Sequence, residues 1–144
     1  MQGWPMFPEE SEPGDMPPAP QRPRRPWSQK FREAVRGMKW GIRGHSSFFV
    51  HFFVAALVVS IAVALGCEPM QWCALLLCIG LVLTAELFNS AIETLHRGLD
   101  AETRERTWKS LDIAAGAVLM ASFTAVAVGL AVFGMRAAQL LNWI

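Results

Sequence analysis

The sequence predicts an all-α integral membrane protein, in which an amphipathic surface helix precedes three transmembrane helices. Of the 144 residues, 53% are hydrophobic and 17% are charged, an apolar share above the roughly 45–50% of soluble domains. The apolar residues gather in three runs, each near the about 20 residues that cross a bilayer. The formal net charge of +1 argues against a general nucleic-acid binder, because such a protein needs a strongly basic face.

Residues 1–26 are expected to form a disordered, Pro-rich cytoplasmic tail. This stretch holds all but one of the nine prolines, together with several acids. Such a composition cannot bury enough apolar surface to offset the entropy lost on ordering. A passive tail and a ligand for a proline-binding partner are both compatible with it.

Residues 28–43 are predicted to form an amphipathic helix on the membrane surface. Four apolar residues recur at intervals of four, three and four, which places them on one helix face; they are Phe31, Val35, Met38 and Ile42. The chain between residues 22 and 45 is strongly basic and contains one acid, Glu33. A basic helix with an apolar stripe is typical of an anionic membrane surface.

Residues 27–144 are predicted to form a membrane domain. After the surface helix, this domain is expected to hold three membrane spans, at about residues 46–67, 70–95 and 110–135. Their apolar centres are long enough to cross a hydrocarbon core about 30 Å thick. Cations flank the first span on its N-terminal side and fill the loop before the third span, whereas the first loop has none. Because cytoplasmic loops carry the excess of Lys and Arg, we expect a cytoplasmic N-terminus and second loop.

The second span contains polar residues that a membrane helix does not need. Glu86, Asn89 and Glu93 are separated by three and four residues, so they lie on one helix face. A carboxylate inside a bilayer costs at least about 2.5–3.5 kcal/mol and is a functional candidate by default. The alternative is a structural carboxylate paired with a neighbouring helix.

The predicted topology brings further polar groups to the cytoplasmic edge. Glu93 and Asp112 offer oxygen ligands for a divalent cation, and Lys109 with the Arg-bearing loop suits phosphate groups. The deeper Glu86 suits a general base for a hydroxyl. Together they describe phosphoryl transfer from a soluble nucleotide to a lipid alcohol, although a proton or ion relay would also use intramembrane acids. The loop at residues 99–107, which includes Arg104, is either a salt-bridged helical turn or a flap over the nucleotide phosphates.

Two motifs resemble the prokaryotic diacylglycerol kinase and undecaprenol kinase family. The first is Glu86-Leu-Phe-Asn89-Ser90-Ala91-Ile92-Glu93, and the second is Asp112-Ile-Ala-Ala-Gly116-Ala-Val-Leu119. The resemblance extends roughly from residue 31 to residue 133. The chain has no Walker pattern, as expected for a family that resembles no P-loop kinase.

The resemblance implies roles for single residues. Glu86 matches the catalytic carboxylate that accepts the proton of the lipid hydroxyl, and Glu93 matches a ligand of the Mg²⁺ bound to ATP. Asn89 matches a polar residue of the active site. Asp112 matches the acid of a Lys-Asp pair near the nucleotide, which makes Lys109 and Arg104 candidates for the phosphates. The family also implies a homotrimer with sites between subunits and a multi-pass location in the bacterial inner or plasma membrane.

The chain departs from the family at three positions. One is Arg97, which stands where an Asp is common. His45 stands where a metal-binding Glu is usual, and Mg²⁺ prefers oxygen to imidazole. Leu111 replaces the usual Lys, so that Lys109 would have to reach from two positions earlier. The sequence therefore predicts ATP-dependent phosphorylation of a lipid alcohol, diacylglycerol or undecaprenol, with His51 favouring the undecaprenol branch slightly. The alternative is a membrane adaptor of the same fold with altered catalysis.

Overall fold

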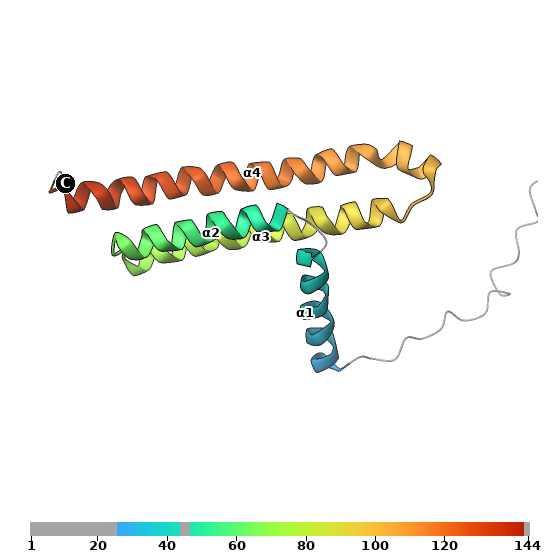
Figure 1. The fold of residues 1–144 in the computed structure, drawn as a ribbon, viewed down its shortest axis with the longest axis horizontal. Coiled ribbons are helices and arrows are strands. Elements are labelled where there is room, and N and C mark those ends of the chain that lie inside the picture. The colour runs from blue at the N-terminus through green and yellow to red at the C-terminus, as the bar shows by residue number, and fades with distance from the viewer. Residues whose placement is uncertain (1–25, 44–46, 143–144) are drawn as a thin grey trace, which may run out of the picture.

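The computed structural model describes residues 26–43 and 47–142, and the only regular secondary structure in them is helical. The helices are α1 (Trp27–Arg43), α2 (Ser47–Ala64), α3 (Pro69–Arg97) and α4 (Ala101–Leu140). In Figure 1, α2, α3 and α4 run side by side, and α1 crosses them at a steep angle near one end. The all-α class is confirmed. The predicted tail, except Pro26, and His45 lie outside the described residues.

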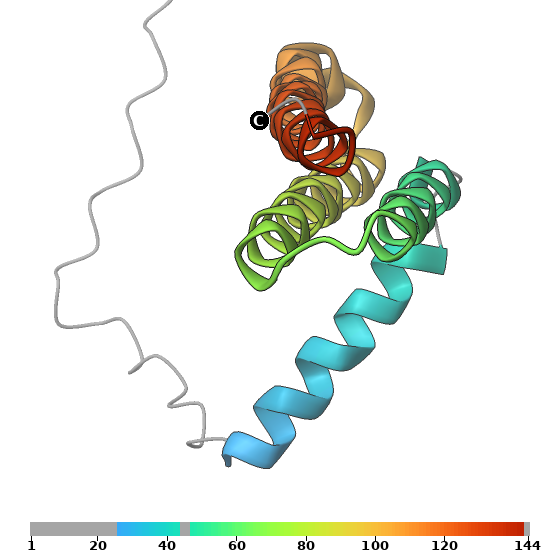
Figure 2. The same ribbon diagram turned by 90° about the vertical axis from the view of Figure 1, so that its left-hand side faces the viewer.

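Helix α1 confirms the predicted amphipathic helix, beginning one residue earlier than expected. None of its residues is buried, and its largest apolar side chains are exposed, as Phe31 and Trp40 illustrate. Cations lie over its indole rings, with Lys30 4.7 Å from the ring centre of Trp27. Since the helix lies across the direction of the other three (Figure 2), its exposed apolar side chains suit a membrane surface.

Helix α1 approaches α3 closely at a glycine. A Cβ atom at Gly41 would lie 2.8 Å from the Cδ2 atom of Leu87, nearer than carbon atoms pack. The missing side chain therefore lets the end of α1 pass directly over α3.

The connection between α2 and α3 is a tight turn whose residues match its geometry. Gly66 has φ of +61°, a left-handed conformation that glycine adopts at no steric cost. Glu68 then caps α3, because its backbone N–H donates to the side chain of Gln71 over 2.9 Å. Pro69 occupies the first turn, where its missing N–H has no helical partner to lose.

The connection between α3 and α4 is shorter than the sequence suggested, because most of residues 99–107 are helical. Asp100 caps α4 by accepting from the backbone N–H of Thr103 over 3.0 Å. One turn on, Glu102 and Arg106 form an exposed ion pair at 2.6 Å. Helix α4 thus has 40 residues, or about 60 Å at 1.5 Å per residue, and extends beyond the predicted span at both ends.

Helices α2, α3 and α4 are each long and apolar enough to cross a membrane, yet they bury little of themselves. Between 11% and 22% of the residues in their most apolar stretches are buried. A small core forms at the end opposite α1, where Ala62, Leu75 and Val132 meet. Exposed apolar surface on this scale needs lipid or further subunits to cover it.

Candidate active site

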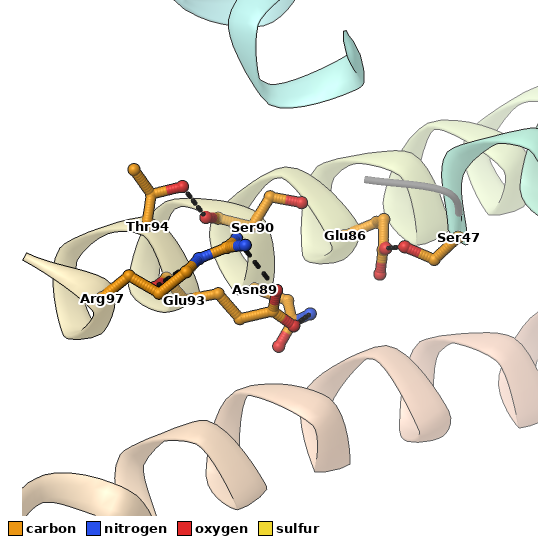
Figure 3. A network of polar contacts seen from close by, with 7 residues as sticks. All are labelled: Ser47, Glu86, Asn89, Ser90, Glu93, Thr94 and Arg97. Carbon is orange, nitrogen blue, oxygen red and sulfur yellow. Dashed lines mark hydrogen bonds and ion pairs between the residues drawn. The ribbon is translucent and has the colours of Figure 1, made fainter. Parts of the chain in front are cut away.

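Glu86 is an almost fully buried carboxylate on α3, held from α2. The residue as a whole is 2% exposed to solvent. The hydroxyl of Ser47 donates to Oε1, as Figure 3 shows. The Nε2 atom of His51, one turn further along α2, lies 3.8 Å from Oε2. Both carboxylate oxygens therefore face polar atoms of the neighbouring helix.

Asn89 and Glu93 form a second polar contact nearer the C-terminal end of α3. The Nδ2 amide of Asn89 donates to Oε1 of Glu93 over 3.0 Å. The Nη2 atom of Arg97 lies 3.5 Å from Oε2 of the same carboxylate, whose side chain is 36% exposed. In Figure 3 these residues lie on the side of α3 that faces α4. The predicted single face of Glu86, Asn89 and Glu93 is therefore present.

Two buried polar atoms have no hydrogen-bond partner among the described residues, namely Oδ1 of Asn89 and Oγ of Ser90. Buried polar atoms are nearly always paired, so each is a candidate contact for a ligand. The Oδ1 atom belongs to the amide that holds Glu93. An amide oxygen beside a carboxylate is a ligand type that suits Mg²⁺.

The described residues can supply only part of a metal site. Within residues 26–43 and 47–142, no three His, Cys, Asp or Glu side chains converge to hold an ion. Mg²⁺ in nucleotide enzymes takes one or two carboxylates from the protein and completes its shell with phosphates and water. Glu93 together with Asn89 fits that smaller requirement. His45, which the sequence predicted as a metal ligand beside Glu93, lies outside the described residues.

A groove of about 1180 Å³ lies between α1 and α3, and its walls are mainly apolar. Gly41 of α1 lines it on one side, and Leu87, Ser90 and Thr94 of α3 line it on the other. Figure 3 shows Thr94 on the side of α3 nearest α1, away from Asn89 and Glu93. The unpartnered hydroxyl of Ser90 therefore belongs to the groove rather than to the α4 side.

The predicted site residues of α4 differ in how they are held. Asp112 and Lys109 are exposed, and the ammonium of Lys109 lies 5.9 Å from the ring centre of Trp108. Arg104 is engaged with backbone, since its Nη2 donates to the carbonyl of Arg97 over 2.9 Å and its Nε to that of Leu99 over 3.0 Å. Its guanidinium thereby satisfies the last carbonyl of α3 and one carbonyl of the turn after it.

Sequence reasoning missed the partners of Glu86. Ser47 and His51 were visible as polar residues at the start of an apolar run, and their spacing of four puts them on one helix face. Which face α2 turns towards α3 depends on packing between the helices, and the sequence carries no direct signal for that.

Comparison with known proteins agrees with the motifs on α3 and α4. The sequence profile of the prokaryotic diacylglycerol kinases matches residues 32–133. A diacylglycerol kinase of Synechocystis sp. is 33% identical over 100 residues, which cover 69% of this chain and 57% of that protein. The matched segment is thus somewhat more than half of the relative. No solved structure matches the chain. The profile match includes α2, α3 and most of α4 with the polar face of α3, and the chain therefore belongs to the prokaryotic diacylglycerol kinase family.

Proposed function

We propose that the chain transfers the γ-phosphoryl group of ATP to the hydroxyl of a membrane lipid alcohol, diacylglycerol or undecaprenol. The observation that carries the proposal is the pair of unlike carboxylates on α3. Glu86 is 2% exposed and lies within a helix long enough to span. Glu93 is partly exposed and lies seven residues nearer the C-terminal end of α3, which is about 10 Å further along the helix. The buried Glu86 suits a lipid hydroxyl, and the partly exposed Glu93 suits a soluble nucleotide.

The chemistry assigns one task to each group. Glu86 accepts the hydroxyl proton while the hydroxyl oxygen forms a bond to the γ-phosphorus. The bond from that phosphorus to the bridging oxygen breaks, and ADP leaves with the electron pair. Glu93 and Asn89 would hold Mg²⁺ against the ATP phosphates, with His45 as a further candidate ligand. When bound, this cation neutralises charge on the phosphates.

Residues of α4 complete the proposed nucleotide site. Asp112, Lys109 and Arg104 lie in the half of α4 that runs back along the cytoplasmic end of α3, as Figure 1 shows for the two helices. Lys109 and Arg104 would balance phosphate charge, because cations form strong hydrogen bonds to phosphate oxygens. Asp112 would contact the nucleotide side of the site.

We further propose a bacterial plasma-membrane location, a cytoplasmic N-terminus and a homotrimer. The orientation is supported by the basic segments before α2 and around the α3–α4 turn. The trimer is supported by the family and by the large apolar surface that α2, α3 and α4 leave uncovered. Neighbouring subunits would then supply site residues that a single chain lacks.

A membrane adaptor with altered catalysis is the second candidate. It is favoured by Leu111, a half-buried apolar residue at the position of the family's usual Lys, and by His45 in place of a metal-binding Glu. The test is the double variant His45→Glu, Leu111→Lys. If the original chain is only a weak kinase and this variant raises or creates activity, the result supports the adaptor.

A phosphorylation assay tests the kinase directly. The purified chain in lipid vesicles with Mg²⁺ and labelled ATP is expected to phosphorylate at least one alcohol from a panel of diacylglycerols and polyprenols. Glu86→Gln is expected to lower turnover at least about 100-fold, since general bases contribute 10²–10⁴-fold, while assembly stays intact on size-exclusion chromatography. Glu68→Gln, a carboxylate at the other end of α3, is the matched control. Absence of turnover on every alcohol would contradict the proposal.

A further inference from the structure

We propose that His51 is a positioning residue for Glu86. Its imidazole lies against the second carboxylate oxygen, while Ser47 donates a hydrogen bond to the first. This inference rests on the proposed function, because it assigns a task within the same site. The two groups come from α2 and the carboxylate from α3, so that one helix sets the direction in which the other presents its base.

The geometry supports this assignment from both oxygens. The Ser47 hydroxyl donates to Oε1, and Nε2 of His51 lies 3.8 Å from Oε2. A single partner would leave the carboxylate free to rotate about its last side-chain bond. A hydrogen bond to one oxygen and an imidazole beside the other both limit that rotation.

The surroundings make His51 the main partner of Oε2. Its side chain is 20% exposed, against 3% for that of Glu86. On its other side His51 lines a cavity of about 280 Å³ between α2, α3 and α4. Apart from His51, the lining residues are apolar except for Cys78 and Ser122, and none carries a charge. No charged group in that cavity competes with Glu86 for the imidazole, and interactions between polar groups are strong in such low-dielectric surroundings.

A positioning role predicts a specific kinetic effect. Proton transfer needs the base within hydrogen-bond reach of the hydroxyl, so loss of orientation lowers the rate of the chemical step. The cytoplasmic carboxylate Glu93 is held by Asn89 and Arg97 of its own helix. ATP binding at the Glu93 end of α3 does not depend on His51. We therefore expect kcat to fall and KM for ATP to stay unchanged.

Steady-state kinetics of the full chain in vesicles test the proposal. His51→Ala is expected to lower kcat about 10- to 100-fold, the scale of loss from a misplaced group, with KM for ATP and lipid within about twofold of the original. His51→Gln keeps an N–H donor at similar reach and should recover most of kcat. Added imidazole should partly restore His51→Ala, because the cavity beside position 51 has room for it.

Val54→Ala is the matched control, since Val54 lines the same cavity one turn along α2 and its apolar side chain offers Glu86 no polar contact. It should leave kcat unchanged. If His51→Ala retains full kcat, or if His51→Gln is as inactive as His51→Ala and imidazole restores neither, the inference is wrong while the kinase proposal stands.

A second readout does not depend on turnover. In the chain labelled with ¹⁵N-histidine, Glu86→Gln should shift the ring nitrogen signals of His51 and leave those of His96 unchanged. Unchanged His51 signals would contradict the contact itself. A chain without any turnover would contradict the proposed function, and the positioning role would fall with it even if the His51 signals shifted.

Discussion

Two carboxylates on one face of α3 have different neighbours. Glu86 is held by side chains of α2, whereas Glu93 is held by Asn89 and Arg97 of its own helix. A shift of α2 against α3 would therefore disturb the contacts of Glu86, whereas the contacts of Glu93 with Asn89 and Arg97 lie within α3. This separation allows acceptor and nucleotide functions to be tested with different variants.

Asn89→Leu is expected to raise KM for ATP-Mg²⁺ about tenfold, with a smaller change in kcat. The substitution keeps side-chain size but removes the amide that holds Glu93 over 3.0 Å and the unpartnered oxygen beside it. Hydrogen bonds to charged groups contribute about 1.5–3 kcal/mol, and 1.4 kcal/mol is tenfold in affinity. Initial rates measured against ATP concentration provide the check.

Thr94→Val serves as the control for this substitution. The Thr94 hydroxyl donates to the carbonyl of Ser90 within the same helix, so its loss should leave KM for ATP unchanged. Equal KM values for Asn89→Leu and the original chain would remove Asn89 from the nucleotide site.

The residues of this face were predictable to different degrees. Helical periodicity alone places Glu86, Asn89 and Glu93 together, and the structure has them so. The contacts of Ser47 and His51 were not predictable, because they require α2 to be rotated correctly about its own axis. The engagement of Arg104 with backbone carbonyls was also hidden, since it depends on the turn that follows α3.

Among the elements, α4 shows where charge patterns mislead. Its first turns carry alternating acids and bases, which are equally typical of a loop and of an exposed helix. The capping contact of Asp100 and the pair of Glu102 with Arg106 stabilise the helical form. The apolar centre of the span was evident from composition, but the helix start depended on one capping side chain.

Asp100 is expected to make the start of α4 sensitive to acid. The backbone N–H and the hydroxyl of Thr103 hold the pKa of the Asp100 carboxyl below its ordinary value. A lowered pKa means that the ionised cap stabilises the folded helix at neutral pH, and that this contribution is lost as pH falls through the carboxyl range, below about 4. Hydrogen exchange, corrected for intrinsic rates, should therefore show less protection of the Thr103 amide below about pH 4 than at neutral pH.

Variants at position 100 separate capping from charge. Asp100→Ala should remove the protection of Thr103 at neutral pH, while Asp100→Asn should keep much of it, because Asn is also a good cap. Protection that persists unchanged in Asp100→Ala would show that the cap does not set the helix start.

Arg104→Ala is expected to loosen the turn between α3 and α4. It removes one hydrogen bond to the last carbonyl of α3 and one to a carbonyl of the turn, and hydrogen exchange should rise in residues 98–101. Arg106→Ala is the control, because its exposed pair with Glu102 contributes at most about 1 kcal/mol. A raised KM for ATP without any change in turn protection would instead support the phosphate role predicted for Arg104.

At the scale of the whole molecule, the two ends of the bundle are built differently. The end near α1 carries the polar face of α3 and the groove. The opposite end is closed by Arg136, whose Nε donates to the carbonyl of Leu65 over 3.0 Å and whose Nη1 donates to Glu68 over 3.3 Å. The sequence predicted the membrane class and the helix count from hydropathy and charge. It did not predict this clamp, which joins residues far apart in the chain.

The orientation of the bundle decides whether the site can meet ATP, and α4 offers a test from both ends. With 40 residues it is about 60 Å long, about twice the thickness of the hydrocarbon core. Both of its ends therefore emerge from the bilayer. The cations before α2 and around the α3–α4 turn predict that Glu105 faces the cytoplasm and Leu140 the outside.

Single cysteines at these two exposed positions test this, after the native Cys67, Cys73 and Cys78 have been replaced by Ser. In intact spheroplasts, a membrane-impermeant maleimide is expected to label Leu140→Cys and to label Glu105→Cys only after permeabilisation. The opposite pattern would place Glu93 and the α3–α4 turn outside the cell. Since ATP is supplied from the cytoplasm, that result would contradict the kinase proposal even if the isolated protein bound nucleotide.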